Sequence, residues 1–180
     1  MPFDPSYPAD GIRIRAVDFR GQFGALKALN DAVPVPVYGR VAADWTSGSA
    51  SFTDVGGLAF AVAAGENWSA EMVLHTISGT TGQGFKFRVS GPGAGSVMIA
   101  MQGTGSGLST AGDCEVQTAF SVASPAKTFC AGSGLTGVVR IHVTVTNATA
   151  GTMQLQASNS TGSGTVTIKA NSDLVARKTG

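Results

Sequence analysis

The sequence predicts a mainly β protein: an antiparallel β-sandwich of the jelly-roll kind, preceded by an extended N-terminal arm and one α-helix. After residue 37, apolar and polar residues alternate with the period of two that marks half-buried strands, and Gly-rich loops separate these segments. We count eight to ten such strands with no crossover helix between them. This pattern favours a jelly roll, with a seven-stranded immunoglobulin-like sandwich as the alternative.

The first segment of the sequence is an arm that cannot fold by itself. Pro2, Pro5 and Pro8 stand among its first eleven residues, and proline both fixes φ and removes a backbone donor. Phe3 and Tyr7 lie between these prolines, and their rings need a surface to pack on. We therefore expect the arm to contact other proteins or other copies of the chain.

One amphipathic helix is predicted over residues 18–33, with Asp18 as its N-cap and Pro34 marking its end. Bulky apolar side chains form one stripe: Phe19, Phe23, Leu26 and Val33, with Leu29 at the flank. Small residues form a ridge on the opposite side: Gly21, Ala25, Ala28 and Ala32. Gly21 and Gly24 each cost about 0.5–1 kcal/mol of helix stability relative to alanine, so the helix needs a partner. It either covers an open face of the sheet or docks on other subunits.

These patterns divide the chain into residues 1–37, an anchoring or oligomerisation segment, and residues 38–180, the sandwich. The stretch "VPVPVYGRV" reads as a stiff connector that runs into the first strand. Alternation assigns a core-facing set in the strands that follow: Trp68, Ala70, Met72, Leu74, Phe85, Phe87, Val89, Val139, Ile141, Val143, Val145, Met153, Leu155, Val166 and Ile168. His75 and His142 fall on the outward-facing positions.

The composition excludes several classes of partner. Charged residues make up 13% of the chain, the net charge is +1, and no basic run interleaves with aromatic residues, which argues against nucleic-acid binding. No apolar run approaches the roughly 18 residues that a membrane span needs, and the N-terminus lacks the pattern of a signal peptide. We expect a protein that is made in the cytoplasm, has no membrane partner, and has a neutral surface suited to an assembly.

No motif predicts catalysis, a cofactor or a metal site. No serine stands in a G-x-S-x-G elbow, and the Gly-rich stretches "SGPGAGS" and "GTGSGL" lack the flanking elements of phosphate-binding loops. The candidates for a carboxylate pair are Asp44, Asp54, Glu66, Glu71, Asp113 and Glu115, and some proximity among eleven acids is expected by chance. Asp54 and Glu66 lack the spacing of a calcium loop. We predict that the chain is not an enzyme.

Two other residue types leave alternatives open. Cys114 and Cys130 are either free thiols or a disulfide that closes one loop, and no Cys/His cluster surrounds them. Trp68 belongs to the core, whereas Trp45 in "AADWTSGS" is the candidate for stacking on a sugar ring.

The chain as a whole resembles a group of small structural proteins encoded in tailed-bacteriophage and prophage genomes. The resemblance rests on its layout and on phrases such as "RGQFGALKAL", "GLAFAV" and "GTVTIKANSDLVARK". It implies a virion surface protein of the capsid-decoration, head-fibre or tail-fibre type, often trimeric, with the major capsid protein or tail components as partners.

The predicted function is a non-enzymatic virion structural protein, most simply a capsid decoration protein held by its N-terminal segment. The residues predicted to anchor it or to lie between subunits are Phe3, Tyr7, Phe19, Phe23, Leu26, Leu29, Gly21, Ala25 and Ala28. The alternative is a tail-fibre or receptor-binding module that contacts host glycans, with Trp45 as the contact residue.

Overall fold

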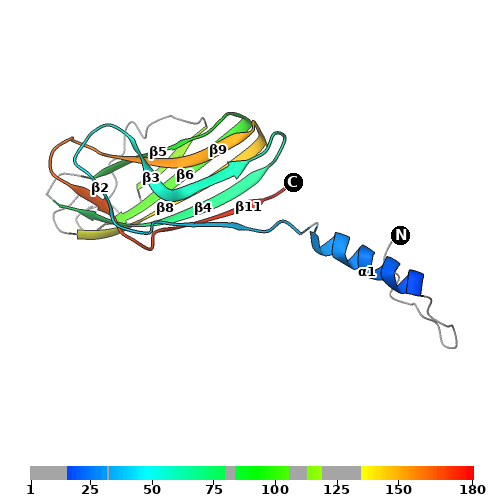
Figure 1. The fold of residues 1–180 in the computed structure, drawn as a ribbon. Helices are drawn as coiled ribbons and strands as arrows, with labels where there is room; N and C mark the ends of the chain where they lie inside the picture. Colours follow the sequence, from blue (N-terminus) through cyan, green and yellow to red (C-terminus); the bar gives the residue numbers. More distant parts are fainter. Residues whose placement is uncertain (1–15, 32, 80–83, 106–112, 119–134) are drawn as a thin grey trace. The chain divides into compact units, whose positions relative to one another are not determined.

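The computed structural model describes residues 16–31, 33–79, 84–105, 113–118 and 135–180. The chain divides into two compact units, Met1–Val35 and Pro36–Gly180. The described part of the first unit is dominated by one helix, and the second unit contains the strands (Figure 1). Phe3, Tyr7 and Cys130 lie outside the described residues.

The described elements are one helix and eleven strands. Their bounds are α1 Ala16–Asp31, β1 Val37–Arg40, β2 Trp45–Ser47, β3 Thr53–Val62, β4 Trp68–Ser78, β5 Phe85–Ser90, β6 Ala94–Gly105, β7 Asp113–Gln117, β8 Leu135–Ala148, β9 Gly151–Asn159, β10 Val166–Ile168 and β11 Asp173–Lys178. The strands form an eight-stranded sheet in the order β1-β11-β4-β8-β6-β7, with β10 joined to β2 and β4, and a three-stranded sheet in the order β3-β9-β5. Every strand pairing among the described residues is antiparallel.

The two sheets pack face to face around one apolar core (Figure 1). Strand β4 shows how the sequence builds it, because every second side chain from Trp68 to Ser78 is buried. Phe85 and Phe87 contribute the two largest fully buried side chains, and their rings stack in parallel with centroids 5.5 Å apart. Each of the core-facing side chains predicted from alternation is buried.

Strand β3 departs from regular pairing where it crosses β9. The register shifts between Asp54 and Ala59, which marks a β-bulge or a similar irregularity, called the bulge below. The Gln154 amide holds this irregular backbone by donating to the carbonyl oxygens of Val55 and Leu58 at 3.0 and 3.3 Å. The bulge therefore has polar support from the neighbouring strand.

The predicted mainly β fold, an antiparallel sandwich with one helix, is confirmed. The strand count is eleven among the described residues, above the predicted eight to ten, because the short strand β2 was not predicted. A strand of three residues, such as β2, is too short to show a period in the sequence.

The prediction that Asp18 is the N-cap of the helix was wrong. Ala16 and Val17 are already helical, so Asp18 lies in the first turn, where its carboxylate still interacts favourably with the helix dipole. The helix ends at Asp31, three residues before Pro34, in agreement with the stop that proline predicts.

Candidate functional site

The first candidate surface is the apolar stripe of α1. Its bulky side chains are exposed by the following fractions: Phe19 54%, Phe23 57%, Leu26 46% and Leu29 64%. The rings of Phe19 and Phe23, one helical turn apart, meet edge to face with centroids 4.7 Å apart. The helix thus presents a contiguous aromatic and aliphatic surface.

The predicted ridge of small residues also lies on α1. Gly21 and Ala28 are exposed, and Ala25 is half-buried. A β-carbon added at Gly21 would meet no heavy atom within 4 Å. Ala32 lies outside the described residues. Both predicted faces of the helix are therefore open at the described positions.

The second candidate surface is a hollow of about 280 Å³ beside Trp45, where the β1–β2 connection meets Gly56 and Gly57 of β3. The half-buried indole of Trp45 donates from Nε1 to the Asp54 carbonyl at 3.1 Å, which fixes the ring at the rim. Asp44 in the same hollow pairs with Lys169 and accepts from the Ala170 N–H at 2.8 Å. These two hydrogen bonds, that from Lys169 first, hold the pKa of the Asp44 carboxyl below its usual value.

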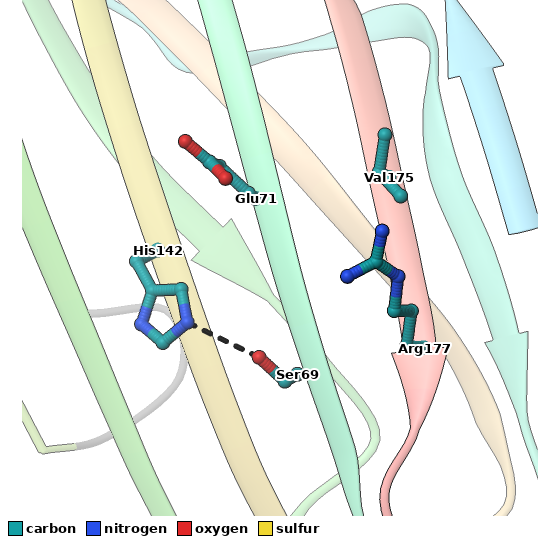
Figure 2. A pocket seen from close by; sticks show the side chains of 5 residues that line it. All are labelled: Ser69, Glu71, His142, Val175 and Arg177. Carbon is teal, nitrogen blue, oxygen red and sulfur yellow. Dashed lines mark hydrogen bonds between the residues drawn. The ribbon is translucent and has the colours of Figure 1, made fainter. Parts of the chain in front are cut away.

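The third candidate surface is a hollow of about 300 Å³ on the outer face of the large sheet, lined by Ser69, Glu71, His142, Val175 and Arg177 (Figure 2). The residues come from three adjacent strands, β4, β8 and β11. In the ladders Glu71 stands opposite both His142 and Val175, and Ser69 stands opposite Arg177. A hydrogen bond of 3.1 Å joins Ser69 Oγ and His142 Nε2 diagonally across β4 and β8.

This polar set contains the side-chain types of a hydrolytic triad without its geometry. Within the described part of the chain, no hydrogen bond joins Glu71 to His142, so the imidazole lacks the carboxylate that would orient it. Around Ser69, strand β4 is paired on one side with β8 and on the other with β11. This pairing engages the backbone N–H groups that could otherwise stabilise an oxyanion.

The sequence placed His142 on an outward-facing position and named Glu71 among the candidate acids, but it did not single out Ser69, Val175 or Arg177. Alternation within "DLVARK" would have put Val175 and Arg177 on the outward positions of their strand. What alternation lacks is the pairing of β11 with β4, which brings these side chains to the others.

Asp54 and Glu66, the two acids considered for a calcium site, are each engaged with other groups of the sandwich. Asp54 accepts a hydrogen bond from the Gln156 amide at 2.6 Å. Glu66 accepts from the Ala63 N–H at 2.8 Å and the Trp68 indole at 2.9 Å, and pairs with Lys178 at 3.0 Å. No group of three or more metal-ligating side chains occurs among the described residues.

The Glu66 contacts predict an acid-sensitive element of stability. They lower the pKa of its carboxyl from 4.5 to about 2, the Ala63 N–H contributing most, followed by the Trp68 indole and Lys178. The unfolded chain takes up this proton at higher pH than the folded chain does, so the stabilisation is present above about pH 4.5 and is lost as pH falls toward 2. We expect Glu66→Gln to lower the urea midpoint at neutral pH, with the gap to the unsubstituted protein closing in acid. A gap that stays constant down to about pH 2 would contradict this linkage.

No helix in the described part of the chain has both the length and the apolar character needed to cross a membrane.

Comparison with known proteins does not assign a family. No protein-family model matches the chain, and no curated protein matches it. Among solved structures, a chain from infectious bursal disease virus, Gt strain, is similar at 12% identity and a TM-score of 0.23, and one from the Gx strain at 11% and 0.21. Each comparison covers 81% of this chain but only 37% and 40% of the viral chains. At such TM-scores nothing about the role of this chain follows from the similarity.

Proposed function

We propose that this chain is a non-enzymatic structural protein of a bacteriophage particle, in which the N-terminal segment joins copies of the chain at the particle surface and the sandwich projects from them. The phage assignment rests on the sequence resemblance of "RGQFGALKAL" and "GTVTIKANSDLVARK" to small virion proteins. The anchoring role rests on α1.

The observation that carries the anchoring role is the exposed apolar stripe on a helix outside the sandwich unit. An isolated helix of about 12–15 residues is marginal in water even with good helix formers, and the 16-residue α1 contains Gly21 and Gly24. Phe19, Phe23 and Leu26 are exposed by roughly half of their surfaces, which is unfavourable for a free helix. A packing partner would bury these side chains, and their burial would stabilise the helix.

The spacing of the stripe favours another copy of the same helix as that partner. Phe19, Phe23, Leu26 and Asn30 follow one another at intervals of four, three and four, the heptad spacing of helices that pack around a common axis. Asn30 then occupies a core position of the repeat, where a single asparagine fixes register and oligomer state. Arg20 and Lys27 flank the seam. We propose a small parallel bundle, a trimer in the simplest case, as the base of the assembly.

Phe23→Asp tests this function. A carboxylate at the centre of the seam would lose its hydration on assembly, so we expect the substituted chain to elute as a monomer in size-exclusion chromatography with light scattering. In phage carrying the substitution, we expect its copy number per particle, counted by quantitative mass spectrometry, to fall at least tenfold, which corresponds to about 1.4 kcal/mol.

Lys27→Glu and the sandwich itself provide the controls. Lys27→Glu places a new carboxylate beside the seam on the same helix, and we expect it to retain oligomers that Phe23→Asp loses. The near-ultraviolet circular dichroism of the sandwich should be the same in both variants, because α1 belongs to the other unit. Full particle occupancy of the Phe23→Asp chain would overturn the anchoring role, whatever its state in solution.

A receptor-binding module is the second candidate, favoured by the half-buried Trp45 at the rim of its hollow. Copies per particle separate the two functions, because a head-surface protein occurs in hundreds and a fibre protein in a handful. Loss of glycan retention in Trp45→Ala would support the receptor role, and unchanged retention would exclude the Trp45 contact.

A further inference from the structure

The hollow on the outer face of the large sheet contains charges that the fold does not use. Glu71 and Arg177 make no ion pair or hydrogen bond with another described residue. By contrast, Glu66 and Asp44 elsewhere on the sandwich are each paired with a lysine. The Glu71 and Arg177 side chains therefore keep their full capacity to bind a ligand.

The geometry places complementary groups around one opening. The carboxylate of Glu71 and the Ser69–His142 pair lie on one side, and the guanidinium of Arg177 extends from β11 on the other, with Val175 beside it (Figure 2). The volume of about 300 Å³ is at the lower end of small-molecule pockets, enough for a single ring. All five side chains stand on paired strands, which hold them in place without a loop rearrangement.

We propose that this hollow binds an acidic sugar unit, a pyranose that bears a carboxylate, as found within anionic polysaccharides. The planar guanidinium of Arg177 matches a carboxylate with two parallel hydrogen bonds. Glu71 accepts hydrogen bonds from sugar hydroxyls, and Ser69 with His142 both donates and accepts. The methyl groups of Val175 contact the apolar C–H face of the ring. This inference does not depend on the anchoring role of α1.

The combination of groups distinguishes this ligand from simpler ones. An inorganic anion or acetate would use Arg177 and leave Glu71 as a repelling charge nearby. A free amino acid could pair with Arg177 and Glu71 but would leave the Ser69–His142 pair unused. A carboxylated polyol engages the guanidinium, the carboxylate and the hydroxyl–imidazole pair at once.

A titration of the full chain with D-glucuronate and D-glucose tests the proposal, since the two sugars differ only in the carboxylate. We expect glucuronate to shift the backbone NMR signals of Ser69, Glu71, His142 and Arg177 with a Kd on the order of 1 mM, ordinary for a ligand of this size. Glucose should bind at least about tenfold more weakly, because it lacks the charge-assisted pair.

Two substitutions separate the site from its surroundings. Arg177→Gln should weaken glucuronate binding by about tenfold, so that glucuronate and glucose bind with similar Kd values. Arg140→Gln is the matched control, because Arg140 is exposed on the same strand as His142 but does not line the hollow. It should leave both affinities unchanged.

Three outcomes would overturn the proposal. The first is acetate shifting the same signals at the same concentration as glucuronate, which would leave a plain anion site. The second is glycine binding more tightly than glucuronate, which would indicate an amino-acid site. The third is the absence of saturable shifts at these residues at about 50 mM glucuronate, far above the expected Kd.

Discussion

Replacing Phe87 by alanine is expected to lower the free energy of unfolding of the sandwich by about 3–5 kcal/mol. Phe87 is fully buried on β5, and its ring stacks on that of Phe85 with an interplanar angle of 3°. The substitution removes this contact and leaves a cavity between the sheets. The surrounding side chains are closely packed and can relax only partly into that cavity. Equilibrium unfolding in urea, monitored by circular dichroism, measures the loss.

Phe23→Ala is the matched control for this measurement. The same side chain is removed, but Phe23 is 57% exposed on α1 and belongs to the other unit of the chain. We expect the unfolding free energy of the sandwich to change by less than about 0.5 kcal/mol. A loss below about 1 kcal/mol for Phe87→Ala would mean that the core repacks around the missing ring.

Gly57→Ala is expected to destabilise the sandwich by about 2–4 kcal/mol. Gly57 has φ +85°, in the left-handed region that side chains disfavour. A β-carbon there would lie 2.0 Å from the carbonyl oxygen of Arg40, so the backbones of β1 and β3 would have to separate. The same urea experiment measures this effect.

The neighbouring glycine gives a sharp contrast. A β-carbon at Gly56 would meet no heavy atom within 4 Å, and Gly56 is not among the residues with positive φ. We expect Gly56→Ala to be neutral or to stabilise by up to about 1 kcal/mol, because alanine restricts the unfolded chain. Equal losses at the two positions would show that the close approach of β1 to β3 is not maintained in solution.

Local patterns predicted much of this fold because burial of one face imposes a period of two on each long strand. The buried positions of β4 and β8, from Trp68 to Leu74 and from Val139 to Val145, followed from alternation alone. The helix was also readable, since its stripe has a period that no strand shares. Its start was misplaced because an acidic residue is favourable both at the cap and in the first turn.

The outer-face hollow could not be predicted, because it depends on which strands are neighbours. Arg177 and His142 are far apart in sequence and come together only because β4 pairs with both β11 and β8. Alternation says which face a residue occupies but contains nothing about strand order. Without the strand order, the charges of Glu71 and Arg177 could not be distinguished from those of an ordinary solvated surface.

The strand order also determines when the large sheet can form during synthesis. Strand β11, Asp173–Lys178, is the last of the described strands, yet it lies between β1 and β4 in the large sheet. On the ribosome, β1 lacks the strand with which it pairs, and β4 keeps an open edge along residues 68–73, until β11 has emerged. Such pairings over long sequence separations form slowly, and open edges invite association with other chains. We therefore expect the sandwich to complete its folding only after this strand has been synthesised, and products that stop before Asp173 to be prone to aggregation.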